Sequence, residues 1–428
     1  MASREGDGAK KTVSISPLLK RLAYPSAAEI QVQASEIASA FALIFEDRLS
    51  VVQSTALLTL LHSTRKDKDA AVIAQCSQRM REAASKIKRP ALREAIRGRN
   101  LRLGQYRGGL CDIVGTGGDS HSTFNVSTTA SIIASPFLLT AKHGNRAQTS
   151  MSGSADVLNA ISPKPPKLSA LTAEKLPQIY RLTNYAFLFA PNFHPGMENV
   201  ACVRRDLGIR TIFNLLGPLA NPVDWAIEAR IVGVAYQELG PVFAEALQLS
   251  GTKKALVVCG AEDLDEISCA GPTNCWMLKE VPNPKYRGPM TEDGEEYTTS
   301  DDDAPSRTIS RLEKFQLSPV DFGLPTHPLS EVYSGKMPKE NAAKLMSILR
   351  NELRPDDPIL DFVLLNTAAL LVISGVCEGD ECKTGRVVKE RGAGGQRWKE
   401  GVRKARWCIE SGQALLQLEK FVEATNSF

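Results

Sequence analysis

A glycine-rich turn between a short apolar run and a helix of small residues constrains this chain more than any other feature. The apolar run at 110–114 predicts a buried strand, GTGGD follows at 115–119, and NVST at 125–128 begins the expected helix. Glycines let backbone N–H groups turn toward an anion. A helix start adds unpaired N–H donors and a favourable dipole. The segment therefore predicts a binding site for a phosphorylated ligand.

The spacing of this loop differs from that of two other phosphate-binding loops. It is not the G-x-x-x-x-G-K-[ST] pattern of P-loop NTPases. It is also not the G-x-G-x-x-G that runs straight into a helix in dinucleotide-binding folds. Asp119 closes the turn, and a carboxylate among phosphate-binding amides is expected to meet a divalent cation or a sugar hydroxyl. A tight structural turn with a capping aspartate is the alternative interpretation.

Two further polar motifs follow the loop. KHGNR at 142–146 places a cation, an imidazole, a glycine and an amide within five residues. SGSAD at 152–156 is a second small polar turn, and it precedes another apolar helix. Both motifs suit the recognition of an anionic ligand. They favour a binding site over a tight turn with only a structural role.

Taken in order, these motifs resemble the anthranilate phosphoribosyltransferases of tryptophan biosynthesis. The same order continues with FLFAPNFHPGM, VRRDLGIRTIFNLLGPLANP, LDEIS, LLNTAALL and KEGVRKARWCIESGQALLQL. The resemblance covers most of residues 15–425, and the chain is similar to the longer, fungal-type members. It implies an enzyme that transfers the phosphoribosyl group of 5-phosphoribosyl 1-diphosphate to the amine of anthranilate, releases diphosphate and uses Mg²⁺.

Hydrophobic patterning predicts an α/β protein with two lobes. Residues 15–106 show helical periodicity, with Ile37, Phe41 and Ile44 on one face. Ser50 and Gln53 predict a capping box at the start of the next helix. Apolar runs at 110–114, 230–234 and 255–259 alternate with helices, which is typical of parallel βαβ units with phosphate loops at the carboxyl edge of the sheet. The resemblance likewise implies a small helical N-terminal lobe on a large α/β lobe with a mainly parallel central sheet, as in nucleoside phosphorylases.

The expected organisation along the chain is a flexible N-terminus at 1–14, a helical lobe at 15–106 and an α/β lobe at 107–428. Stretches at 282–305 and 375–395 look like insertions, and the second is expected to be mobile. The acidic triplet at 301–303 predicts a solvated loop rather than a metal site. By the resemblance, 165–195 returns to the helical lobe, and two chains form a homodimer through their helical lobes.

The resemblance assigns the substrate-binding residues. Donor binding is expected from Gly115, Thr116, Gly117, Gly118, Asp119, Asn125, Ser127, Thr128, Lys142 and Ser154. Anthranilate binding is expected from Gly115, His143, Asn145, His194 and Arg204. Arginine suits the anthranilate carboxylate because its planar fork binds carboxylates in a bidentate manner. Arg205, the neighbour of Arg204, is the alternative for that role.

The metal and the chemistry follow the same pattern. Mg²⁺ takes oxygen ligands, usually one or two carboxylates with substrate phosphates and water. Asp265 and Glu266, just beyond the apolar run at 255–259, are the expected ligands, with Ser127 as a further contact. No dedicated catalytic acid or base is expected. The amine of anthranilate is neutral at pH 7, so orientation and preorganised charge carry the reaction.

Composition sets the frame for partners and location. The net charge is only +4, and no apolar run is long enough to span a bilayer, so neither nucleic acid nor a membrane is expected as a partner. The basic stretch at 86–107 has almost no stacking aromatics, which favours a solvated helix over a nucleic-acid contact. Nine scattered cysteines indicate reduced thiols and a cytoplasmic protein. A pyrimidine nucleoside phosphorylase and a catalytically silent ligand-binding regulator are the competing interpretations.

Overall fold

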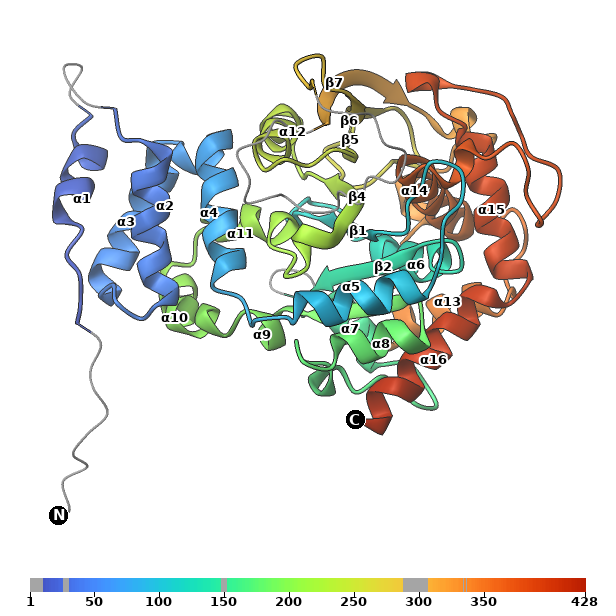
Figure 1. Ribbon diagram of the computed structural model, residues 1–428, viewed down its shortest axis with the longest axis horizontal. Coiled ribbons are helices and arrows are strands. Elements are labelled where there is room, and N and C mark those ends of the chain that lie inside the picture. The colour runs from blue at the N-terminus through green and yellow to red at the C-terminus, as the bar shows by residue number, and fades with distance from the viewer. Residues whose placement is uncertain (1–10, 26–30, 148–151, 288–306, 334, 336) are drawn as a thin grey trace.

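The structure is a computed structural model that describes residues 11–25, 31–147, 152–287, 307–333, 335 and 337–428. The acidic triplet at 301–303, most of the first predicted insertion and residues 1–10 of the predicted flexible N-terminus lie outside the described residues. Two lobes lie side by side along the long axis of the molecule (Figure 1).

Helices form the smaller, N-terminal lobe. They are α1 (Ser16–Ala23), α2 (Ala34–Phe45), α3 (Val51–Ser63) and α4 (Ala70–Glu82). Ile37, Phe41 and Ile44 of α2 are buried, as the periodicity predicts. We use "helical lobe" below for α1–α4.

The predicted capping box at the start of α3 forms only in part. The Ser50 hydroxyl accepts the Gln53 N–H at 3.3 Å. The Gln53 side chain, however, accepts the N–H of Ile15 at 2.8 Å instead of turning back to Ser50. The unpaired amide at the start of α1 competes for the same side chain, and this contact ties α1 to α3.

A seven-stranded sheet forms the centre of the large lobe. Its strands are β1 (Leu110–Gly115), β2 (Leu139–Gly144), β3 (Tyr185–Phe189), β4 (Ile227–Gly233), β5 (Ala255–Gly260), β6 (Thr273–Pro282) and β7 (Thr308–Leu317). The order is β3-β2-β1-β4-β5-β6-β7; the first five strands pair in parallel, and β6 and β7 are antiparallel. This confirms the predicted mainly parallel α/β fold. The order reverses between β1 and β4, where loops diverge and leave a crevice for ligands.

Helices cover both faces of the sheet. The helices that follow α4 along the chain are α5 (Arg89–Gly98), α6 (Val126–Ala134), α7 (Ser154–Asn159), α8 (Leu176–Leu182), α9 (Ala190–Phe193), α10 (Glu198–Leu207), α11 (Phe213–Leu216), α12 (Leu239–Leu249), α13 (Pro338–Leu349), α14 (Pro358–Ser374), α15 (Trp398–Glu410) and α16 (Gln413–Ser427). One core packs α6, α14, α15 and α16 against one face, and a second core joins α10, α11 and α12 to the helical lobe on the other. None of the described helices combines the length and apolarity that a bilayer crossing requires.

The predicted return of 165–195 to the helical lobe is wrong for much of that segment. Tyr185–Phe189 forms β3, which pairs with β2, and α8 packs on α5, β3 and α16. The YAFLF run is buried throughout, which is typical of a strand in a parallel sheet. The segment that contacts the helical lobe begins later, with α10 against α2 and α3 and α11 against α4.

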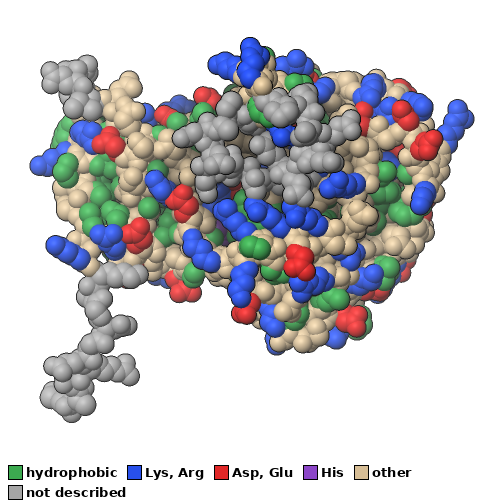
Figure 2. Space-filling view, in the orientation of Figure 1, with side chains coloured by type: hydrophobic (Ala, Val, Ile, Leu, Met, Phe, Trp, Pro, Cys, Tyr) green, Lys and Arg blue, Asp and Glu red, His purple; other side chains and the backbone are tan. Residues whose placement is uncertain are grey.

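Helix α5 also lies outside the helical lobe, although it was expected within 15–106. Its buried residues Leu92 and Ala95 belong to the core of the large lobe. Arg89 and Arg93 each place a guanidinium 5.3 Å from the Trp225 ring centroid. Figure 2 shows Lys and Arg side chains gathered along the middle of this face, in the region of α5.

The second predicted insertion, 375–395, is bonded along its length to neighbouring segments. Asp380 pairs with Arg397 at 2.9 Å, and the Val388 N–H donates to Glu400 at 2.9 Å. These bonds connect the insertion to α15 and the turn before it; its mobility stays a prediction.

Candidate active site

The predicted site residues lie at one edge of the sheet because most of them follow the carboxyl ends of parallel strands. The glycine loop 115–119 follows β1, His143 and Asn145 close β2, His194 follows β3, and 265–266 follow β5. Parallel strands end at the same edge, so segments far apart in sequence meet there.

The glycine loop lies between β1 and β4 and faces the loop after β5. The Gly117 N–H donates to Asp265 Oδ2 at 2.7 Å. Gly117 and Gly118 have φ of +63° and +81°, a region that favours glycine. A Cβ at Gly115 would lie 2.3 Å from Asp265 Oδ2. The Asp265 carboxylate therefore accepts a hydrogen bond from a backbone amide in a glycine loop, and such amides typically bind anions.

Three carboxylates gather beside this loop. Asp119 Oδ2 accepts the Asp265 N–H at 3.4 Å, and Glu266 accepts the Thr123 hydroxyl at 3.4 Å. Burial, with the nearby charge of Asp119, raises the pKa of Asp265 to about 7. Burial and the charge of Asp265 raise the pKa of Glu266 well above its usual range. The cluster carries more negative charge than its surroundings stabilise.

This excess of carboxylate charge fits a divalent cation. Ser127, Gly115, Asp265 and Glu266 line one narrow cavity, so the three predicted Mg²⁺ contacts lie together. Across the described part of the chain, no three or more His, Cys, Asp or Glu side chains converge as a closed metal site. Mg²⁺ is usually held by one or two carboxylates plus substrate phosphates and water, so two carboxylates and a hydroxyl suit it.

Lys142 provides a buried cation on the other side of the cluster. Its side chain is 2% exposed, and Nζ donates to the His143 carbonyl at 3.3 Å. Burial lowers the pKa of Lys142, while the charges of Asp112, Glu266 and Asp265 oppose that shift. The ammonium is thus held among carboxylates at the centre of the site.

The starts of α6 and α7 place the predicted phosphate contacts. Asn125 precedes α6, and its Oδ1 is a buried atom with no hydrogen-bond partner among the described residues. The same is true of Thr128 Oγ1. Ser154 begins α7 and lies against Gly144, where an added Cβ would sit 3.3 Å from Ser154 Cβ. Buried polar atoms without partners cost free energy, which a polar ligand recovers.

The two histidines predicted to bind the acceptor lie against each other. The His143 and His194 rings meet edge to face with centroids 5.2 Å apart, and both are buried. Burial lowers the pKa of His194 to about 4 and that of His143 well below its usual range. Both rings are therefore neutral at pH 7. Asn145 is exposed, and its carbonyl accepts the Ala155 N–H at 3.2 Å, which holds the SGSAD turn near β2.

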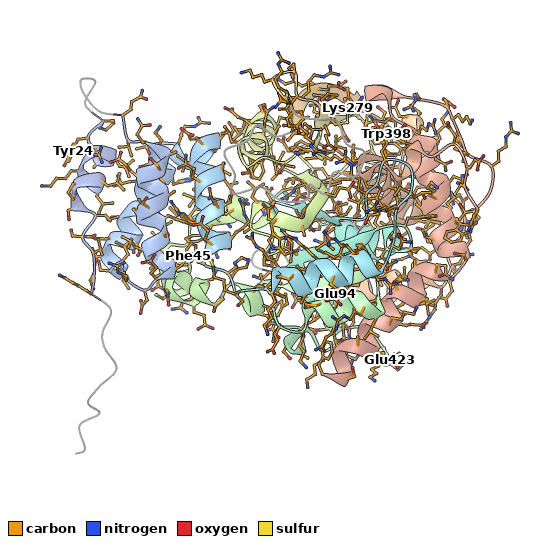
Figure 3. The ribbon with its side chains drawn as sticks, viewed as in Figure 1. Tyr24, Phe45, Glu94, Lys279, Trp398 and Glu423 are labelled. Carbon is orange, nitrogen blue, oxygen red and sulfur yellow. The ribbon has the colours of Figure 1, made fainter. Side chains whose placement is uncertain are left out.

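The structure separates the two adjacent arginines of α10. The Arg204 guanidinium is half-buried and lies 5.3 Å from the Phe213 ring centroid. Phe213 itself packs on Phe45, which Figure 3 labels at the end of α2 beside α10. Arg205 is exposed and pairs with Asp206 at 3.2 Å. The inward position of Arg204 favours it over Arg205 as the acceptor residue.

Some residues at the site were missed from the sequence. Arg210 donates to the Gly117 carbonyl at 3.1 Å, and the Tyr236 hydroxyl donates to the Gly118 carbonyl at 3.3 Å. Asp112 is buried within β1 and accepts Asn221 Nδ2 at 2.8 Å. A charged residue inside the apolar run of β1 was a signal for Asp112, whereas nothing local pointed to Tyr236.

Comparisons with known proteins agree with this arrangement. The chain matches the glycosyl transferase family, a/b domain, over residues 107–287 and 298–415. It is 38% identical over 384 residues to the anthranilate phosphoribosyltransferase of Schizosaccharomyces pombe, covering 90% of each chain. It is 36% identical over 324 residues to the Saccharomyces cerevisiae protein of that name, covering 74% of this chain and 73% of the relative.

Solved structures are similar over nearly the whole chain. Anthranilate phosphoribosyltransferase from Saccharomyces cerevisiae in complex with PRPP and Mg has a TM-score of 0.74 and 30% identity, covering 97% of this chain and 99% of that one. The same yeast protein in complex with 4-fluoroanthranilate has a TM-score of 0.71 and 28% identity, covering 96% and 98%.

Proposed function

The chain belongs to the anthranilate phosphoribosyltransferases of the glycosyl transferase family, and from that premise we propose how its residues divide the work. The enzyme transfers the phosphoribosyl group of 5-phosphoribosyl 1-diphosphate to the amine of anthranilate and releases diphosphate, a step of tryptophan biosynthesis. The observation that carries the assignment of roles is the meeting of the glycine loop 115–119 with Asp265 and Glu266 where the strand order reverses.

The glycine loop binds the diphosphate of the donor. Breaking the bond between ribose C1 and the diphosphate oxygen leaves positive charge on the sugar and negative charge on the leaving group. The Gly117 N–H donates to Asp265 in the absence of the donor, so the Asp265 carboxylate moves away before this amide, with that of Gly118, stabilises the charge. Asn125, Ser127 and Thr128 at the start of α6 bind the remaining phosphate with the helix dipole, and Ser154 closes the site.

Asp265 and Glu266 hold Mg²⁺ together with the donor, and Ser127 faces the same cavity. When bound, Mg²⁺ neutralises charge on the diphosphate. Lys142 lies buried near both carboxylates, and their charges oppose the fall in its pKa that burial causes. Asp119 lies at the end of the loop, where its carboxylate accepts a ribose hydroxyl or a metal-bound water.

The acceptor lies between the lobes. Arg204 binds the anthranilate carboxylate, since a half-buried guanidinium with a planar fork suits a bidentate carboxylate. His143 and His194 contact the aromatic ring as neutral imidazoles, and Asn145 contacts the amine from the end of β2. None of these residues needs to remove a proton before attack, because the amine is already neutral. Catalysis rests on holding the amine beside ribose C1.

A coupled binding and turnover assay tests the function. The purified protein is incubated with 5-phosphoribosyl 1-diphosphate, Mg²⁺ and anthranilate, and the loss of anthranilate fluorescence is followed. Turnover that requires all three, with diphosphate released in equal amount to anthranilate consumed, is the expected result. Donor binding without turnover would instead indicate a silent regulator, and phosphate-dependent cleavage of a pyrimidine nucleoside would indicate a phosphorylase.

We also propose that two chains form a homodimer through their helical lobes. Tyr24, Val51 and Val52 support this, because they leave apolar side chains 78%, 58% and 77% exposed on one lobe. Light scattering after gel filtration should give twice the 46.5 kDa chain mass. Val52→Asp should lower that mass toward the monomer, whereas Leu182→Asp on the large lobe should not. An unchanged dimer with Val52→Asp would contradict this interface.

A cytoplasmic location is a further proposal. All nine cysteines are free, and reduced thiols are typical of that compartment. Fractionation of cells that express the full chain should recover the protein with cytoplasmic markers; recovery in an organelle fraction would contradict it.

A further inference from the structure

The side chain of Arg210 lies directly on the glycine loop. Its Nη2 donates to the Gly117 carbonyl oxygen at 3.1 Å. A Cβ at Gly118 would lie 1.4 Å from Arg210 Nη1 and 2.4 Å from Cζ, so the guanidinium occupies the space that a side chain there would need. Two observations therefore favour glycine at position 118: its positive φ, and the close approach of the Arg210 guanidinium.

Arg210 reaches the loop from the segment that joins the lobes. This segment follows α10, which packs on α2 and α3, and it precedes α11, which packs on α4 (Figure 1). Gly208 ends α10 with φ of +63°, and the Thr211 N–H donates to Asn214 Oδ1 at 2.9 Å. The backbone on both sides of Arg210 is therefore held, and its side chain extends toward the large lobe.

The guanidinium has donors to spare. It carries five N–H groups, and within the described part of the chain one of them is used, in the bond to Gly117. Arg210 is partly exposed, so the others face the mouth of the site.

We propose that Arg210 binds the diphosphate of the phosphoribosyl donor from the side of the glycine loop that faces the helical lobe. The inference rests on the proposed function, in which this loop receives the diphosphate. Loop amides meet the anion from one side, and the planar guanidinium meets it from the other with hydrogen bonds that suit phosphate oxygens. The donor site then includes a residue that follows α10, the helix that carries the proposed acceptor residue Arg204.

Calorimetric titration of inorganic diphosphate in the presence of Mg²⁺ tests the proposal on the full chain. Arg210→Gln should raise the Kd for diphosphate about ten- to hundred-fold, the loss expected for charge-assisted hydrogen bonds. Arg210→Lys should fall between it and the wild type, because an ammonium keeps the charge but loses the fork. Arg205→Gln is the matched control. Arg205 is an exposed arginine in the last turn of α10, and it pairs with Asp206.

Steady-state kinetics separate binding from bracing of the loop. In Arg210→Gln, the KM for the donor should rise by a similar factor, while the KM for anthranilate stays within about two-fold. A lower kcat with unchanged diphosphate affinity would mean that Arg210 only braces the loop, and it would overturn the proposal. If Arg210→Gln does not fold, Arg210→Lys decides: wild-type affinity for diphosphate overturns the proposal, and weakened affinity supports it. A wild-type protein that neither binds diphosphate nor turns over would instead contradict the proposed function.

Discussion

Replacing Asp265 by asparagine should stabilise the protein in the absence of ligands. In the native state the pKa of Asp265 is raised from 3.8 to about 7, chiefly by burial. The native carboxyl thus binds its proton more tightly than the unfolded chain does, so ionisation lowers the free energy of unfolding as pH rises from about 4 to about 7. The amide side chain of the variant would keep an oxygen for the Gly117 N–H and remove the charge.

The size of the effect follows from that pKa. At about 1.36 kcal/mol per pH unit, the rise corresponds to roughly 4 kcal/mol at pH 8. Asp265 is partly exposed and shares its surroundings with Asp119, so we expect a gain of about 2 to 3 kcal/mol. With an unfolding entropy of about 2.1 cal/mol/K per residue, a chain of 428 residues should show a Tm increase of roughly 3 °C.

Thermal unfolding at several pH values is the assay. The Tm difference between Asp265→Asn and the wild type should be largest at pH 8 and should vanish near pH 4, where Asp265 is protonated. Excess Mg²⁺ should raise the Tm of the wild type more than that of the variant, because a cation relieves the same repulsion. Asp206→Asn, at an exposed aspartate, should have no such pH dependence. A variant less stable than the wild type at pH 8 would refute the reasoning, since the charge would then be structural.

Two further predictions concern single side chains. Arg204→Ala should raise the KM for anthranilate about ten- to hundred-fold while the KM for the donor changes little, because the lost bonds are to the acceptor carboxylate. Steady-state kinetics test this, with Arg205→Ala as the control. Equal effects on the KM values of both substrates would show that Arg204 does not bind the acceptor. Burial raises the pKa of Cys382, but hydrogen bonds from Thr384 and Lys404 lower it to about 7. Iodoacetamide should therefore label Cys382 faster than the more exposed Cys202 at pH 7. The labelling rate of Cys382 should reach half its maximum near pH 7. Mass spectrometry of the two peptides measures the rates, and faster labelling of Cys202 would show that access, not ionisation, decides.

The features that were predictable from the sequence are those formed by residues close together along the chain. Strand, glycine turn and helix start between 110 and 128 are contiguous, so their chemistry and their arrangement could be inferred together. Asp265 and Glu266 were predictable only as residues just after a strand, and the rule that parallel strands share a carboxyl edge brought them to the loop.

The remaining features depend on contacts between distant segments. The bond from Gly117 to Asp265 joins residues 148 positions apart, and that from Arg210 to Gly117 joins residues 93 apart. No periodicity reports such pairs. The segment 165–195 was placed in the helical lobe by the resemblance alone, and its pairing of β3 with β2 is a contact between distant segments that no local pattern reports.

A crystal structure of the protein with 5-phosphoribosyl 1-diphosphate and Mg²⁺ tests the central claim most directly. The account predicts diphosphate density against the glycine loop 115–119, with the metal held by Asp265 or Glu266 and the Asp265 carboxylate moved away from the Gly117 N–H. Diphosphate bound elsewhere, with Asp265 still bonded to Gly117, would contradict it.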